Sequence, residues 1–249
     1  MRNKTVLLFL ATILSFGSSM AHASFILNGD FEATKDGRNN LKLNGPTVKE
    51  KDRTELIGWT SSEFGNSRGV GGYNFLLNGS IANTNKSALW LEGDNNGYKA
   101  SPTGGNFFAS DSQYYPGVLS QKVNNLTKGV DYILTFDYAL AQQVGFVGAN
   151  YDNFWEVGFG NATQNTTKLT IQDNEFSGWK SASMTFTATG ASELLSFLAK
   201  GTAPGAPPFM LLDNVNLVSA VPEPATLALM LGGVGLLGFS ARRCRDGQA

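Results

Sequence analysis

Alternation of apolar and polar side chains is the feature that most restricts how this chain can fold. In DYILTFDYAL, residues 131–140, every second residue from 132 to 138 is a large apolar or aromatic one, and Thr135 and Asp137 stand between them. A β-strand places successive side chains on opposite faces, so this period of two predicts a strand with one buried face. Residues 117–123 are expected to be its hairpin partner, because the turn-forming NNLTKG joins the two stretches.

Other strand candidates follow along the chain, separated by clusters of Gly, Asn, Ser and Thr. They are residues 88–92, 153–160, 168–172, 180–189, 193–200 and 209–218. Segment 193–200 also has helical propensity, but the Gly- and Pro-rich stretch after it leaves room for only about two turns, so a strand is predicted. Many short strands with polar turns, and no clear amphipathic helix, predict an all-β chain folded as a β-sandwich.

The start of the chain has the features of an export signal. Arg2 and Lys4 precede an apolar run, and Ala21-His22-Ala23 has the small-x-small pattern that signal peptidase cleaves. Residues 1–23 are therefore expected to be a signal peptide, with the mature protein beginning at Ser24.

The end of the chain has the features of a single membrane anchor. Residues 225–241 contain no charged side chain, and Arg242, Arg243 and Arg245 follow at once. This pattern predicts a short transmembrane helix with a cytoplasmic basic stop, and the prolines at 222 and 224 separate it from what precedes. Residues 24–219 are then one exported domain.

Histidine and cysteine are missing from this expected domain. The only histidine, His22, leaves with the signal peptide, and the only cysteine, Cys244, lies in the basic tail. Disulfides, Ser-His-Asp or Cys-His catalysis and zinc sites built on His or Cys are therefore excluded there. Residues 24–221 contain 14 Lys and Arg against 18 Asp and Glu, a net charge near −4, which disfavours nucleic-acid binding.

Residues 220–245, AVPEPATLALMLGGVGLLGFSARRCR, resemble the PEP-CTERM sorting signal of Gram-negative bacteria. The resemblance rests on the triplet Pro222, Glu223, Pro224, the apolar span and the basic cluster. It implies that an exosortase, a membrane-embedded cysteine protease-transpeptidase, recognises the triplet and cleaves there or nearby. The protein would then be anchored in the inner membrane for a time, before it reaches the cell surface or the medium.

The expected domain resembles galactose-binding-like jelly-roll domains, which include many carbohydrate-binding modules. The residues that carry the resemblance are FILNGDFE (25–32), LIGWT (56–60) and FMLLDNVNLV (209–218). The family commonly holds a structural Ca²⁺ between its first and last strands, and Glu32 and Asp213 match its carboxylate ligands. The turn at Asn28 is expected to add a backbone carbonyl. Otherwise these acids are ordinary turn and strand-end residues.

Aromatic residues are candidates for stacking on sugar rings. Trp155 alternates with apolar neighbours and Trp59 follows the family pattern, so both are expected in the core. Tyr98, Tyr114 and Tyr115 lie in turn-rich stretches and are expected to be exposed, where they can contact a glycan. Residues 67–90 are rich in Gly and Asn and match no sugar-site pattern.

These features favour a non-catalytic surface or matrix protein that associates with extracellular polysaccharide. The first alternative is a structural biofilm protein that binds protein partners and no sugar. The second is a glycoside hydrolase or lyase that uses a carboxylate pair, such as Asp152 with Glu156 or Glu92 with Asp94. Such an enzyme needs a defined carboxylate separation, which spacing along the chain does not establish.

Overall fold

The computed structural model describes residues 23–43, 53–63, 73–91, 96–202 and 206–220. The expected signal peptide, apart from its last residue, and the expected transmembrane helix with its PEP triplet and basic stop lie outside these ranges. Within them, no helix is long and apolar enough to span a membrane.

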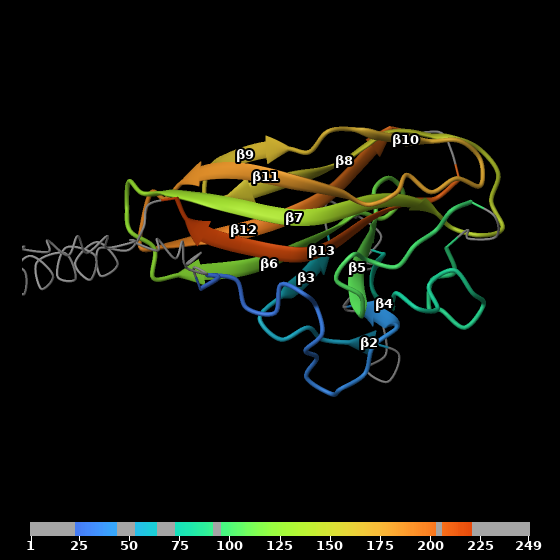
Figure 1. The fold of residues 1–249 in the computed structure, drawn as a ribbon, viewed down its shortest axis with the longest axis horizontal. Helices are drawn as coiled ribbons and strands as arrows, with labels where there is room; N and C mark the ends of the chain where they lie inside the picture. Colours follow the sequence, from blue (N-terminus) through green and yellow to red (C-terminus); the bar gives the residue numbers. More distant parts are fainter. Residues whose placement is uncertain (1–22, 44–52, 64–72, 92–95, 203–205, 221–249) are drawn as a thin grey trace, which may run out of the picture.

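The described residues form a β-sandwich of two sheets (Figure 1). The seven-stranded sheet has the order β11 (Lys180–Thr187), β7 (Asp131–Gln142), β13 (Pro208–Ser219), β5 (Asn106–Asp111), β4 (Asn74–Asn78), β1 (Leu41–Leu43), β2 (Arg53–Thr54). The second has the order β10 (Leu169–Ile171), β8 (Asn150–Phe159), β12 (Ser192–Thr202), β6 (Gly117–Asn124), β3 (Thr60–Glu63), with β9 (Ala162–Asn165) also paired to β8. All strand pairs are antiparallel except the short pair β1–β2, which is parallel.

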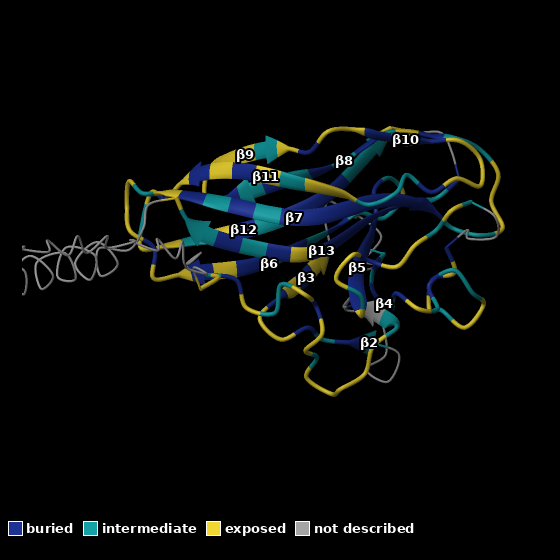
Figure 2. Cartoon of the chain, in the orientation of Figure 1, coloured by how far each residue is buried: buried dark blue, intermediate teal, exposed yellow. Residues whose placement is uncertain are grey.

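The main core lies between the sheets and confirms the predicted alternation. In β7, Leu134 and Phe136 are buried in this core, and Thr135 between them is not. Segment 193–200 is a strand, as predicted, and its Phe197 meets Trp155 of β8 edge to face with ring centroids 6.0 Å apart. Trp155 and Trp59 are both core residues, as predicted. Figure 2 shows the same division, with long buried stretches in the central strands and mostly exposed or half-exposed residues in the loops.

A second apolar cluster covers part of the outer face of the seven-stranded sheet. It combines outward residues of the sheet, such as Leu77, Phe107 and Leu211, with Leu89 and Leu91 from the long connection between β4 and β5. Residues 88–92 were expected to form a strand, which is wrong: of the described residues 88–91, only Leu91 makes an isolated bridge, to Gln143. These apolar side chains cover a sheet face and do not extend a sheet.

The expected hairpin of residues 117–123 with 131–140 is also wrong. β6 and β7 belong to different sheets, and the turn between them crosses the end of the sandwich. Leu126 in this turn is buried, and its N–H donates to Ala191 O at 3.0 Å. The inward side chains of β6 and β7 pack face to face in the main core, which leaves each strand to pair with more distant parts of the chain.

Candidate functional site

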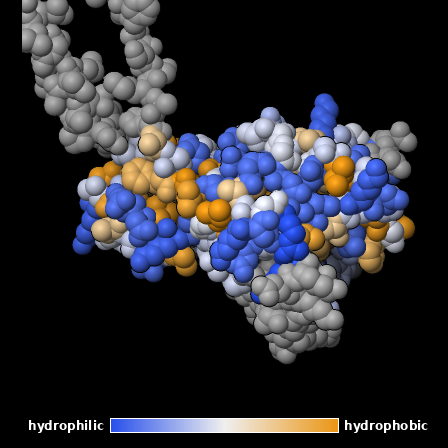
Figure 3. Space-filling model, turned by 90° about the horizontal axis from the view of Figure 1, so that it is seen from below, coloured by the Kyte–Doolittle hydropathy of each residue, from blue (hydrophilic) through white to orange (hydrophobic). Residues whose placement is uncertain are grey.

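Apolar surface alone does not locate a binding site on this molecule. On the face seen in Figure 3, apolar residues form separate groups among polar ones. A pocket of about 480 Å³ lies beside the second apolar cluster and is within the size range of small-molecule sites. Its lining residues are Tyr73, Phe75, Ala88, Leu89, Asp111, Tyr114, Tyr115, Gln143, Phe146, Pro207 and Phe209.

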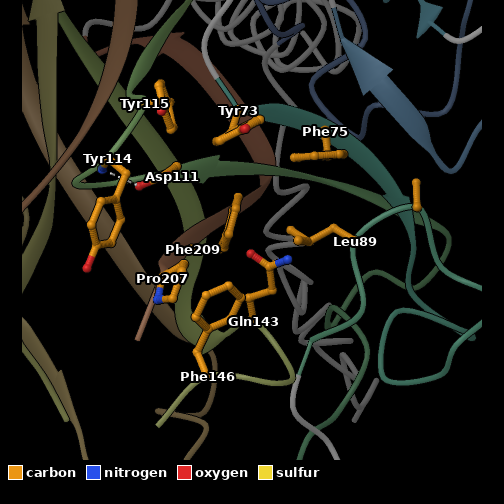
Figure 4. Close-up of a pocket in the computed structure, with 11 residues that line it drawn as sticks. Tyr73, Phe75, Leu89, Asp111, Tyr114, Tyr115, Gln143, Phe146, Pro207 and Phe209 are labelled. Carbon is orange, nitrogen blue, oxygen red and sulfur yellow. Dashed lines mark hydrogen bonds between the residues drawn. The ribbon is translucent and has the colours of Figure 1, made fainter. Parts of the chain in front are cut away.

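The floor of the pocket is the part of the outer sheet face that the long connection leaves open. In β4, Phe75 points outward because its neighbours Asn74 and Leu76 point inward, and in β13 the same alternation turns Phe209 outward and Met210 into the main core. The rings of Phe75 and Phe209 meet edge to face at 5.9 Å. Tyr73, just before β4, packs edge to face on Tyr115 at 4.6 Å. Figure 4 shows these rings together at one side of the hollow.

Two loops place exposed aromatic rings at the rim. Tyr114 lies in the connection between β5 and β6, and Phe146 in the connection between β7 and β8; each is 48% exposed. Figure 4 shows both near Pro207, on the side opposite Phe75. An amphipathic or flat ligand can therefore contact aromatic surface both on the floor and at the rim.

Besides the tyrosine hydroxyl groups, Asp111 and Gln143 supply the polar side chains among the described residues of this lining. Asp111 ends β5 and is 1% exposed, and its Oδ1 accepts hydrogen bonds from the N–H groups of Gln113 at 2.7 Å and Tyr114 at 2.9 Å. Burial raises the pKa of Asp111, and these backbone donors only partly offset the effect. The combination of apolar walls with a few polar groups is typical of sites that bind small polar molecules.

The structure treats the three predicted tyrosines differently. Tyr114 and Tyr115 both line the pocket, although Tyr115 is half-buried against Tyr73. Tyr98 was expected to be exposed, but it is partly buried: its ring packs on Phe176 and its hydroxyl donates to Gly79 O at 3.2 Å. It does not line the pocket.

The aromatic and polar residues that complete the pocket were not predicted as site residues. They include Tyr73, Phe75, Asp111, Gln143, Phe146 and Phe209. The alternation of Tyr73 and Phe75 around Asn74 was the one local signal, because it marks an aromatic strand face. The other residues come from separate segments, and no spacing along the chain links them.

The second predicted site, around Glu32 and Asp213, involves the last residues of the connection between β4 and β5 and the start of β5. The Asp213 carboxylate is buried and accepts hydrogen bonds from the hydroxyl groups of Ser101 and Thr103. Glu32 accepts two from Asn106, through the backbone N–H at 2.5 Å and the amide Nδ2 at 2.9 Å. Burial raises the pKa of Asp213 to about 6, and the negative charge of Glu32 adds to the shift.

The first segment of the chain lies beside the last strand, as the calcium prediction requires. Phe25 N–H donates to Leu217 O at 2.8 Å, and Val215 N–H donates to Gly29 O at 2.9 Å. A β-carbon at Gly29 would overlap Val215 O, so this close approach requires glycine. The segment bends too strongly to be a regular strand.

Asn28 has a local role in the same segment. Its amide group donates to Ala33 O and Ile57 O and accepts from Ala33 N–H, while its backbone carbonyl accepts from the Trp59 indole at 2.9 Å. These bonds fasten the turn, and the part of Asn28 in a calcium site stays a prediction. Among the described residues, no third Asp, Glu, His or Cys joins Glu32 and Asp213.

The suggested catalytic pair Asp152 and Glu156 is arranged as two ion pairs. Glu156 pairs with Lys200, with a 2.5 Å distance between Oε2 and Nζ, and Asp152 lies 3.7 Å from Lys168. Glu92 and Asp94 lie outside the described residues. A lysine beside each carboxylate is typical of a structural surface pair.

Comparison with known proteins identifies the C-terminal segment. Residues 220–245 are a PEP-CTERM protein-sorting motif. A motif of this kind indicates an exported protein with a C-terminal membrane anchor before processing. No curated protein matches the chain.

Solved structures similar to the chain include sugar-binding proteins. TmCBM61, solved in complex with β-1,4-galactotriose, has 14% identity and a TM-score of 0.38, over 73% of this chain and 99% of its own. A putative sugar binding protein from Bacteroides thetaiotaomicron has 11% identity and a TM-score of 0.41, over 79% and 100%. The CBM22-1 xylan-binding domain from Paenibacillus barcinonensis Xyn10C has 15% identity and a TM-score of 0.36, over 66% and 87%.

Proposed function

We propose that the exported domain is a non-catalytic module of the galactose-binding-like jelly-roll type that binds extracellular polysaccharide. The observation that carries this proposal is the pocket, in which aromatic rings of the floor and rim surround one carboxylate and one amide. An aromatic face covers the C–H face of a sugar ring and excludes water from it, while Asp111 and Gln143 supply polar partners for hydroxyl groups. Among the described lining residues Asp111 is the single carboxylate, whereas a glycosidase needs two.

Retention on immobilised polysaccharides tests the proposal. Tyr114→Ala and Phe146→Ala each remove an exposed rim ring, so neither should disturb folding. We expect each to weaken binding to the retained polymer about tenfold, a loss of about 1.4 kcal/mol. Tyr151→Ala is the matched control, because Tyr151 is an aromatic residue of similar exposure, 49%, that does not line the pocket. Equal losses in all three variants, or no retention of the wild type on any polymer, would contradict a pocket-based sugar site and favour a matrix protein with protein partners.

Two further elements belong to this proposal. An exosortase recognises Pro222-Glu223-Pro224, releases the domain from the inner membrane and passes it to the cell surface or medium. A structural Ca²⁺ lies between Glu32 and Asp213, where two carboxylates and the hydroxyl groups of Ser101 and Thr103 offer the oxygen ligands that calcium prefers.

A further inference from the structure

The pocket has an uneven distribution of charge. Its lining includes Asp111, and no Lys or Arg is found among the described residues that form it. The hydrogen bonds to Asp111 come from backbone N–H groups, which are neutral donors. When Asp111 is ionised, its charge therefore faces the pocket without a cationic partner in this lining.

The surroundings of Asp111 strengthen the effect of that charge. The carboxyl group is almost fully buried at the end of β5, and the rings of Tyr73, Phe209 and the adjacent tyrosines line the same hollow. Charges interact more strongly where water is excluded than they do on an open surface. A carboxylate or sulfate group on a ligand would meet this charge, and the part of the lining that the structure describes holds no positive side chain to compensate it.

We propose that the pocket selects uncharged sugar chains and rejects chains with carboxylate or sulfate groups, because its described lining places the carboxylate of Asp111 among aromatic rings and includes no Lys or Arg. This selectivity rests on the proposed function of the same pocket. Hydroxyl groups of a neutral sugar can donate hydrogen bonds to Asp111, whereas an anionic group can only repel it.

A matched pair of ligands tests the selectivity. The neutral polymer that wild-type protein retains best is compared at pH 8 with the same polymer after its primary alcohols have been oxidised to carboxylates. Wild type should bind the oxidised polymer at least tenfold more weakly than the neutral one. Like charges that are brought together in a complex lower its affinity by at least this factor.

Two variants separate charge from shape. Asp111→Asn removes the charge at nearly constant size, and Gln143→Lys adds a positive charge to the lining and leaves Asp111 in place. Both should reduce the ratio of neutral to oxidised affinity several-fold, and a melting curve shows whether each is folded. Gln143→Met is the matched control: it removes the amide without adding charge, so it should weaken binding of both polymers and leave their ratio unchanged.

The outcomes distinguish this inference from the proposed function. If wild type binds no polymer of either kind, the proposed function fails. If it binds only anionic polymers, the sugar site stands and the charge selection is wrong. If wild type binds neutral and oxidised polymers equally, the site stands and the charge selection is wrong. If the oxidised polymer is rejected to the same degree by wild type, Asp111→Asn and Gln143→Lys, the rejection is steric and the role given to Asp111 is wrong.

Discussion

Two carboxylates from opposite ends of the chain, Glu32 and Asp213, are brought near enough for the charge of one to affect the other. Asp213 is buried, and its carboxylate accepts hydrogen bonds from two hydroxyl groups. A β-carbon at Gly105 would overlap the carboxylate of Glu32, so the backbone closes tightly over this acid. Without a cation, ionised Asp213 carries a desolvation cost that a bound Ca²⁺ would offset.

Calcium should therefore stabilise the folded domain. At a hundredfold excess over its Kd, an ion that binds only the folded state adds about 2.7 kcal/mol, or roughly 5–10 °C in Tm for a domain of this size. Chelator should lower the wild-type Tm by that amount, and Asp213→Asn and Glu32→Gln should lose the response. Glu175→Gln is the control, because Glu175 likewise accepts a backbone N–H. Identical wild-type melting curves in chelator and in millimolar calcium would show that no such site exists.

The same response should depend on pH. Calcium needs the ionised carboxylate, and the pKa of Asp213 in the folded protein is about 6, raised from 3.8. A proton therefore competes with calcium as pH falls through 6, and the calcium-dependent shift in Tm should be smaller at pH 5 than at pH 7.5. In chelator, the stability of the domain changes with pH in the other direction. Because the folded pKa of Asp213 is raised, its contribution to stability falls as pH rises through 6.

At the scale of elements, the connection between β6 and β7 decides how the sandwich closes. Leu126 is 5% exposed and anchors this connection at the end of the main core. Its N–H bonds to Ala191 O, and Gly129 N–H bonds to Ala188 O at 2.8 Å, which ties the crossing to the turn between β11 and β12. The crossing is thus part of the core and not a free loop.

Leu126→Ala should lower the free energy of unfolding by about 2–4 kcal/mol, because it removes a buried side chain and leaves a cavity. Urea denaturation of the isolated domain measures this change. Leu194→Ala is the matched control, since Leu194 in β12 is 55% exposed and its truncation should cost less than about 0.5 kcal/mol. Similar losses in both variants would contradict the anchoring role of the crossing.

At the scale of the whole molecule, the pocket lies at one end of β13, and Phe25 and Ala220 lie at the other. Phe209, near the start of β13, is on the pocket floor, and Leu217, near its end, is hydrogen-bonded to Phe25. A strand of 12 residues covers roughly 35–40 Å. Ala220, at which the sorting motif begins, is still tied to the sandwich by its N–H to Asp131 O at 2.8 Å. The pocket therefore lies near the end of β13 that is far from Ala220.

Processing should remove the anchor and leave this domain intact. In cells with the matching exosortase, the surface or secreted form should lack the segment from about residue 225 onward. Mass spectrometry of that form measures this, and a strain without the exosortase is the control, in which the anchor should persist. Recovery of peptides from residues 236–245 in the surface form of the first strain would contradict the proposed processing.

Local patterns in the sequence determined strands β6 to β8 and β10 to β13, many core side chains and the sorting motif. The alternation in β7, and the burial of Trp59 and Trp155, follow from which side of a strand a residue occupies, and a period of two shows this directly. The sorting motif is contiguous, so its residues are recognisable without a fold. The approach of the first segment to the last strand was expected from a family resemblance and is found in the structure.

The tertiary structure alone decided which strands pair and where the pocket forms. β6 and β7 were expected to pair because they are adjacent in sequence, but burying both apolar faces in one core places them in opposite sheets. Tyr73, Asp111, Gln143 and Phe209 come from four segments, and only the sheet order β7-β13-β5-β4 brings them to one hollow. Periodicity reports which way a side chain points along its own strand, and the choice of neighbouring strand depends on the packing of the entire chain.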